Sequence, residues 1–413
     1  MKGTSASSNK VGSVTDIEKA QNGSQAKLMM EAEDNQDSPS VPMVILKLIV
    51  CTITGMVFGI SMEKARVFEP QAIRQQMVFE NFIMLKMFLA AVAAGQLCLA
   101  LLSVLPWAKG RFQTASEEYA KCFSDKSILT SAIGAFVLGC GMTLAGTCPG
   151  MVLIQVGTWT ANAIFTFLGA LIGALTYGML APHLAKFTSP RKAFEKQQVY
   201  TKFNIPFFAL ALPMALLLCV VIFLIEYFHG WETDLFGRSN DRGHNFMQKL
   251  AWPPYCAGAL VGLMQIPIVL TVQDTLGGST SYVTIVSQWV VTKRLKELFP
   301  YLAKKRWGVG NWWQVFYVVG GVFGGTISAA ASGTLMSVPG PTLPAALLGG
   351  VLILWGSRFA AGCTSGHGLS GMGVLAWLSF VAVPFMFGGA IVTAFSMRAT
   401  GALTDYVTTT GAV

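Results

Sequence analysis

Nine long apolar stretches, separated by short polar segments, constrain this chain more than any other feature. A helix that crosses a bilayer needs about 20 mainly apolar residues. The stretches are residues 42–60, 82–105, 127–147, 151–182, 205–229, 252–272, 311–333, 343–361 and 366–397. The sequence therefore predicts an all-α, polytopic membrane protein with about nine transmembrane helices. The two longest stretches, 151–182 and 366–397, are each predicted to hold one tilted helix plus a short re-entrant helix.

Composition agrees with a membrane protein and excludes two other classes. Of the 413 residues, 53% are hydrophobic and 12% are charged, and the charged fraction is about half of what soluble domains carry. A soluble core of this size could not bury so much apolar surface, whereas lipid can solvate it. The net charge of +9 comes from short segments between the apolar stretches. We therefore expect a lipid bilayer and no nucleic acid as a partner.

The basic residues are distributed unevenly among the connecting segments. Segments 106–126, 183–203 and 291–307 carry 15 Lys and Arg residues, whereas 61–80, 230–250 and 334–342 carry 6. By the positive-inside rule, the first group and the N-terminus are cytoplasmic, and nine crossings place the C-terminus outside. No short apolar core typical of a signal peptide follows the first charges, and this favours the cell membrane.

An internal repeat divides the chain. At a constant offset of 215 residues, Gly134 corresponds to Gly349, Gly141 to Gly356 and Cys148 to Cys363. The pairs Gly55/Gly59 and Gly258/Gly262 have a spacing that favours close helix packing. The predicted parts are a disordered polar tail (1–40), a first transmembrane repeat (41–204), a linking helix and loop (205–250), a second repeat (251–400) and a C-terminal tail (401–413). Because one linking span separates the halves, they should be inverted, with a site at their interface near the midplane.

Each half contains one cysteine where an apolar stretch is interrupted. The residues expected to break the helices are Gly146, Pro149 and Gly150 around Cys148, and Gly362, Ser365 and Gly366 around Cys363. Proline or clustered glycine interrupts a helix, and the helix that restarts directs its N-terminal N–H groups at the break, where they attract anions. This pattern predicts a pathway for an anion.

Other polar residues near the two breaks are candidates for contact with the ion. They are Thr147, Gln155, Arg358, Thr364 and His367. Gln155 could equally bridge two helices, Arg358 could extend to the membrane surface, and His367 could make a structural hydrogen bond. Cys363 and His367 are too few ligands for a zinc site, so we expect no metal. The sequence contains no ATP-binding loop. We therefore expect no cofactor and no catalytic residue. Glu226, at the end of a span, is the nearest candidate for coupling to a driving ion.

The two interrupted segments resemble the YeeE/YedE family of membrane proteins. The resembling residues are Gly141–Gln155 (GMTLAGTCPGMVLIQ) and Arg358–Met372 (RFAAGCTSGHGLSGM), and the resemblance covers residues 42–400. It implies uptake of thiosulfate through a narrow route in which Cys148 and Cys363 hold the ion by S–H···S hydrogen bonds. It also implies a small soluble sulfur-carrier protein as a candidate partner. Family members often have a third cysteine in the first loop, but residues 62–70 contain none.

Two other functions remain open from the residues alone. A membrane sulfurtransferase would form a persulfide on an activated cysteine thiolate. A transporter of a different small solute would use the cysteines for packing or redox sensing. The packing role is expected for Cys51, Cys98, Cys140, Cys219 and Cys256, which lie in or beside apolar stretches.

Overall fold

The computed structural model describes residues 41–121, 126–188, 198–240, 245–292 and 295–408. The predicted tail, 1–40, and Cys122 lie outside the described residues. The chain divides into two units, 1–46 and 47–413. Of the first unit, the structure describes residues 41–46, which are helical.

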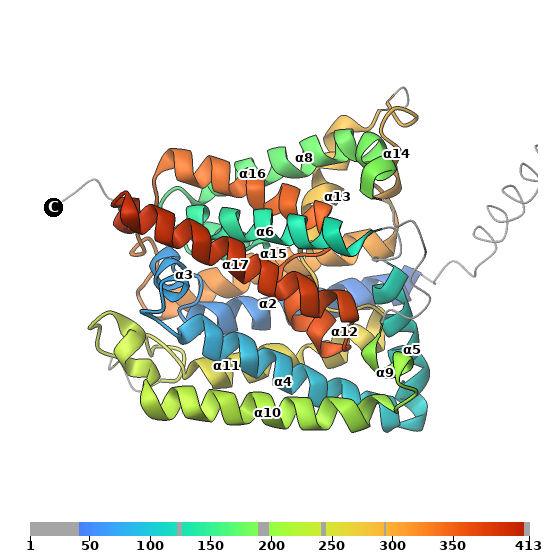
Figure 1. The fold of residues 1–413 in the computed structure, drawn as a ribbon, viewed down its shortest axis with the longest axis horizontal. Helices are drawn as coiled ribbons and strands as arrows, with labels where there is room; N and C mark the ends of the chain where they lie inside the picture. Colours follow the sequence, from blue (N-terminus) through green and yellow to red (C-terminus); the bar gives the residue numbers. More distant parts are fainter. Residues whose placement is uncertain (1–40, 122–125, 189–197, 241–244, 293–294, 409–413) are drawn as a thin grey trace, which may run out of the picture. The chain divides into compact units, whose positions relative to one another are not determined.

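The described residues are mostly helical and contain very little strand (Figure 1). The first part of the chain forms α2 (Val41–Lys64), α3 (Pro70–Met77), α4 (Ile83–Val104), α5 (Pro106–Lys121), α6 (Ile128–Ala145), α7 (Pro149–Gly157), α8 (Ala163–Thr188), α9 (Val199–Lys202) and α10 (Phe207–Phe228). The second part forms η1 (Trp231–Leu235), α11 (Pro254–Leu263), α12 (Gln265–Thr271), α13 (Ser279–Val290), α14 (Pro300–Lys304), α15 (Val309–Ala331), β1 (Gly340–Pro341), α16 (Leu343–Phe359), η2 (Thr364–Gly371), α17 (Trp377–Ala399), η3 (Ala402–Thr404) and β2 (Tyr406–Val407). Strands β1 and β2 pair antiparallel.

The predicted membrane-spanning architecture is confirmed. Within the described residues, eight helical segments are long and apolar enough to cross a bilayer, and α16 with η2, bent by 47°, makes a ninth. The stretch 151–182 begins in the short helix α7 and continues in α8, and the stretch 366–397 begins in η2 and continues in α17. Each therefore holds a short helix and a long one, as predicted. The sequence analysis missed α5 and α13, which are less apolar.

Glycines allow the long helices to approach closely. A Cβ atom on Gly59 of α2 would lie 2.1 Å from the Gly321 carbonyl oxygen of α15. A Cβ atom on Gly258 of α11 would lie 2.2 Å from the Met87 carbonyl oxygen of α4. Both contacts leave no room for a side chain, so the predicted packing role of these small-residue pairs is confirmed.

Helices α6 and α16, which carry the corresponding glycines of the two halves, pack against each other reciprocally. A Cβ on Gly134 would lie 2.9 Å from the Gly356 carbonyl oxygen, and a Cβ on Gly141 would lie 2.9 Å from that of Gly349. Gly134 corresponds to Gly349 in the repeat, and Gly141 corresponds to Gly356. Gly134 therefore contacts the counterpart of Gly141, and Gly141 contacts the counterpart of Gly134. A two-fold relation produces such reciprocal contacts, although the inverted repeat itself stays a prediction.

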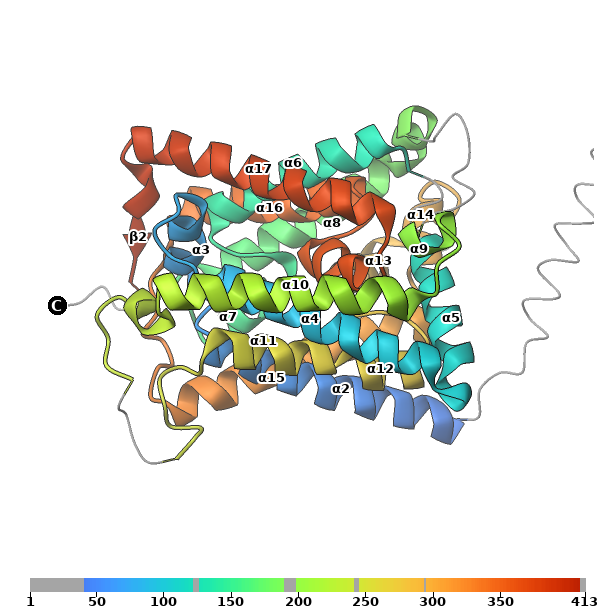
Figure 2. The same ribbon diagram turned by 60° about the horizontal axis from the view of Figure 1, so that its bottom comes forward.

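The connecting segments separate into two groups in space. Figures 1 and 2 show α5, α9 and α14, from the three basic segments, at one end of the long helices. Helix α3 and strand β2 lie at the opposite end. The basic and less basic segments thus lie on opposite sides, which is the arrangement that the charge distribution requires.

Candidate functional site

Both cysteines of the repeat lie where one helix ends and another begins. Helix α6 ends at Ala145, its C-cap residue Gly146 has a left-handed φ of 60°, and Cys148 is the N-cap residue of α7. Helix α16 ends at Phe359, and Cys363 is the N-cap residue of η2. The Cys148 carbonyl accepts the Val152 amide at 3.0 Å and the Cys363 carbonyl accepts the His367 amide at 2.7 Å. The sequence therefore positions the two thiols in equivalent local structures.

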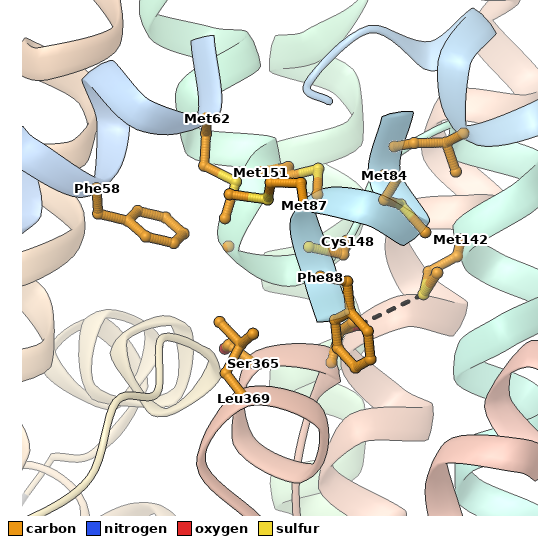
Figure 3. A pocket seen from close by; sticks show the side chains of 13 residues that line it. Phe58, Met62, Met84, Met87, Phe88, Met142, Cys148, Met151, Ser365 and Leu369 are labelled. Carbon is orange, nitrogen blue, oxygen red and sulfur yellow. Dashed lines mark hydrogen bonds between the residues drawn. The ribbon is translucent and has the colours of Figure 1, made fainter. Parts of the chain in front are cut away.

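Cys148 lines a buried cavity that we name the methionine chamber. Its volume is about 40 Å³, and it is lined by Phe58, Met62, Ile73, Met84, Met87, Phe88, Met142, Cys148, Gly150, Met151, Thr364, Ser365 and Leu369. Figure 3 shows these side chains, with thioethers contributed by α2, α4, α6 and α7. Nearly all of the surface is carbon and sulfur. The Thr364 hydroxyl donates to the Met142 sulfur at 3.4 Å.

Cys363 lines a second cavity, which we name the arginine chamber. Its volume is about 80 Å³, and it is lined by Tyr119, Asp274, Thr275, Leu276, Gly277, Ser279, Thr280, Gln314, Arg358, Ala361, Gly362, Cys363 and Gly366. In contrast to the methionine chamber, it presents hydroxyl, amide, carboxyl and guanidinium groups. The two chambers therefore offer different chemistry to an ion.

The guanidinium of Arg358 is held at the N-terminus of α13. It donates to the Ser279 hydroxyl and, at 3.3 Å, to the Thr280 hydroxyl. Its Nε atom is buried and has no acceptor among the described residues. The N-cap residue of α13, Gly278, provides no side-chain cap, and the Thr280 amide donates to the Gln314 side-chain oxygen at 3.2 Å. A helix N-terminus of this kind favours negative charge. This corner of the arginine chamber can bind an oxyanion.

Ser365 lies between the two chambers. Its side chain lines the methionine chamber, and its hydroxyl oxygen is 3.1 Å from the sulfur of Cys363, which lines the arginine chamber. A polar side chain and a thiol thus connect the two cavities where η2 begins.

Three predicted site residues form hydrogen bonds within the protein instead of lining a chamber. The buried amide of Gln155 donates to the Phe68 carbonyl at 2.7 Å and to the Gly146 carbonyl at 3.0 Å, so it stabilises the break after α6. The buried His367 ring lies 3.1 Å from the Ala360 carbonyl oxygen and 3.2 Å from the Ser379 hydroxyl. Thr147 is also fully buried. The Gln155 amide thus joins the break after α6 to the loop after α2, and His367 makes structural hydrogen bonds, as considered above.

Four of the remaining predicted residues line a chamber, whereas Pro149 lines neither chamber. Gly150 and Thr364 line the methionine chamber, and Gly362 and Gly366 line the arginine chamber. Pro149 is the first residue of α7, and its carbonyl accepts the Tyr282 hydroxyl at 2.6 Å.

The sequence analysis missed the segment 274–280 and the five methionines. The segment Asp274-Thr-Leu-Gly-Gly-Ser-Thr280 could have been noticed, because it is another polar, glycine-containing interruption after an apolar stretch. The methionines had no such signal, because separate elements bring them together. Met62 lies in the last turn of α2, just before the loop in which the resembled family often has its third cysteine.

Comparison with known proteins decides the family. The model of a family described as sulphur transport matches residues 64–392. The chain belongs to this family. It is the YeeE/YedE family that the two cysteine motifs indicated, and a transporter family favours a non-enzymatic role.

Two named relatives align along most of their length. A thiosulfate transporter, TsuA, of Escherichia coli is 24% identical over 364 residues, which cover 84% of this chain and 92% of the relative. The TsuA of Spirochaeta thermophila is 27% identical over 350 residues, which cover 82% of this chain and 95% of the relative. The similarity therefore extends over nearly the whole of each relative.

Proposed function

We propose that this chain transports thiosulfate across the membrane, along a route that passes the thiols of Cys148 and Cys363. The observation that carries the proposal is that each thiol lies at a helix break and lines one of two adjoining chambers. The sulphur-transport family and the names of the two relatives support the same substrate.

The two chambers match the two ends of a thiosulfate ion. The ion carries three oxygens at one end and a soft, polarisable sulfur at the other. Arg358, Ser279 and the N-terminus of α13 suit the oxygens. Thiols are weak hydrogen-bond donors and thioethers are polarisable, so they suit the sulfur end without holding it tightly. Conduction requires binding that is weak enough for release.

The other residues predicted for the pathway shape or support it. Gly146, Pro149, Gly150, Gly362 and Gly366 form the breaks, and Thr364 and Ser365 line the methionine chamber. Gln155, Thr147 and His367 support the breaks from the buried side.

The family resemblance and the charge distribution extend the proposal. The cell membrane is the proposed location, with the N-terminus and the end that carries α5, α9 and α14 in the cytoplasm. A small soluble sulfur-carrier protein would receive the ion there. The proposed architecture is two inverted repeats, 41–204 and 251–400, and the reciprocal contacts of α6 and α16 support it.

Uptake by the purified protein tests the substrate. Proteoliposomes should accumulate or exchange radiolabelled thiosulfate above protein-free liposomes, and excess unlabelled sulfate should compete poorly because it lacks the soft sulfur. Equal uptake by liposomes with and without protein would overturn the proposal. Mass spectrometry after incubation tests the sulfurtransferase alternative: one added sulfur atom on Cys148 or Cys363 would indicate covalent transfer.

A further inference from the structure

Asp274 lies on the wall of the arginine chamber. It belongs to the segment 272–278 between α12 and α13, beyond the end of the span 254–271. It lines the same cavity as Arg358 and Cys363. Its Oδ1 atom accepts the Thr275 amide at 2.7 Å. In the part of the chain that the structure describes, Asp274 forms no ion pair with Lys, Arg or His.

The groups around Asp274 bring the pKa of its carboxyl toward neutral pH. Helix α5 brings Glu118 and Tyr119, α15 brings Trp313 and Gln314, the segment after α14 brings Lys305, and α16 brings Arg358. Burial raises the pKa of Asp274 to about 6, and Glu118 acts in the same direction. The Thr275 amide, the Trp313 indole and Lys305 oppose the rise. This carboxyl can therefore gain or lose a proton near physiological pH.

A carboxylate on this wall is costly for the proposed substrate. Thiosulfate is a dianion, and a like charge nearby disfavours both ionised groups. Protonation of Asp274 removes the repulsion, so the ion should bind better to the protonated chamber. Linkage is reciprocal: the bound ion must raise the proton affinity of Asp274 by the same factor.

Asp274 is also the acidic residue best placed for this role. Among the described residues, no other Asp or Glu lines either chamber. Glu226, the carboxylate favoured from the sequence, forms an ion pair with Lys86 at 2.7 Å. It lines a separate cavity formed by α4, α10 and α11. Its charge is already compensated, and it is not in contact with the chambers.

We propose that Asp274 binds the proton that is transported together with thiosulfate. This inference rests on the proposed transport of thiosulfate and adds its coupling ion. A proton from the side of uptake forms an O–H bond with the Asp274 carboxylate when the dianion enters the arginine chamber. That bond breaks when the dianion leaves, and the proton departs on the opposite side. One carboxyl carries one proton, so the transported pair has a net charge of −1.

Proteoliposomes separate proton coupling from transport itself. With the wild type, an acid-outside pH gradient should drive accumulation of radiolabelled thiosulfate, and an inside-negative potential should slow it. A pH-sensitive dye inside the liposomes should report acidification when thiosulfate is added outside. The Asp274→Asn variant should exchange internal for external thiosulfate but lose gradient-driven accumulation and acidification. Asp274→Glu should retain both, and so should Glu226→Gln, the matched control.

A measurement on the wild type alone keeps the inference testable if Asp274→Asn does not fold. In weakly buffered detergent solution at pH 7, binding of thiosulfate should take up as much as one proton per chain. Affinity should be constant below pH 6 and then fall by about tenfold per pH unit, until the higher pKa of the bound state is passed.

The outcomes separate the two proposals. Exchange without proton uptake by the wild type, or gradient-driven accumulation by Asp274→Asn, would overturn the coupling role and leave thiosulfate transport intact. A wild type that neither exchanges nor binds thiosulfate would overturn both.

Discussion

The sulfur of Cys363 lies 3.1 Å from the hydroxyl oxygen of Ser365, although the two side chains line different chambers. This contact joins the lining of the methionine chamber to that of the arginine chamber. In the proposed route, it is where the ion leaves one environment and enters the other.

Replacing Ser365 by Ala should slow transport without unfolding the protein. The change removes the hydroxyl beside Cys363 and little volume. We expect the initial rate of thiosulfate uptake to fall by about fivefold, which corresponds to one hydrogen bond of about 1 kcal/mol. Ser396→Ala, which removes an exposed hydroxyl on α17, is the control. An unchanged rate in Ser365→Ala would exclude a role for this hydroxyl.

Arg358 should contribute mainly to binding of the ion. Arg358→Gln removes the positive charge beside Ser279 and Thr280. A hydrogen bond to a charged group contributes about 1.5–3 kcal/mol, so KM for thiosulfate should rise by about tenfold or more. Arg398→Gln, on the exposed part of α17 where Arg398 pairs with Glu80 at 2.9 Å, should leave KM unchanged. A KM for Arg358→Gln equal to that of the wild type would refute the assignment.

The close packing of α6 on α16 should make Gly141 intolerant of a side chain. A Cβ atom there would lie 2.7 Å from the Ile353 backbone nitrogen. We expect Gly141→Ala to destabilise the protein by about 1–3 kcal/mol, seen as a lower midpoint of thermal unfolding in detergent. Gly388→Ala is the matched control, because a Cβ on Gly388 of α17 meets no atom within 4 Å. Equal midpoints for the two variants would contradict this packing.

The loop after α2 is fixed by buried ion pairs whose contribution should depend on pH. The Arg66 guanidinium donates to Glu69 at 2.6 Å, and Arg238 does so at 2.8 Å. Burial alone would raise the pKa of Glu69, but Arg66 and Arg238 hold it below its ordinary value of 4.5. Because the folded pKa is the lower one, the stabilisation is present above pH 4.5 and is lost as the pH falls through the folded pKa.

Glu69→Gln should therefore reduce stability at pH 7 by about 1.5–3 kcal/mol, the contribution of hydrogen bonds to a charged group. Arg66 would keep its ion pair with Glu63 at 2.7 Å, whereas the half-buried Arg238 would lose its carboxylate partner. The difference from the wild type should shrink below pH 4.5. Thermal unfolding of both proteins at several pH values measures it. A difference that stays constant between pH 7 and pH 3.5 would show that these ion pairs do not act as described.

The sequence was sufficient to predict where the helices break, but it was insufficient to predict which residues line the chambers. Gly146 and Pro149 interrupt a helix by local backbone chemistry, so the positions of Cys148 and Cys363 at restarting helices could be predicted. The roles of Gln155 and His367 depended on which groups the fold brings near. Gln155 reaches the Phe68 carbonyl, 87 residues away in the chain, and no local pattern encodes such a contact.

The same reasoning explains why Asp274 and the methionines were missed. Met62 and Met151 come from separate helices, and methionine in an apolar stretch is most often packing. Asp274 follows an apolar span in a short polar segment, and only the fold shows that Arg358 lies on the same cavity wall.

Uptake of radiolabelled thiosulfate by proteoliposomes that contain Cys148→Ser or Cys363→Ser tests the central claim most directly. Cys219→Ser, on the exposed face of α10, is the control for loss of a thiol. We predict that both chamber variants insert and remain folded but lose most uptake, while Cys219→Ser transports like the wild type. Uptake at the wild-type rate by the double variant Cys148→Ser/Cys363→Ser would contradict a route that passes these thiols.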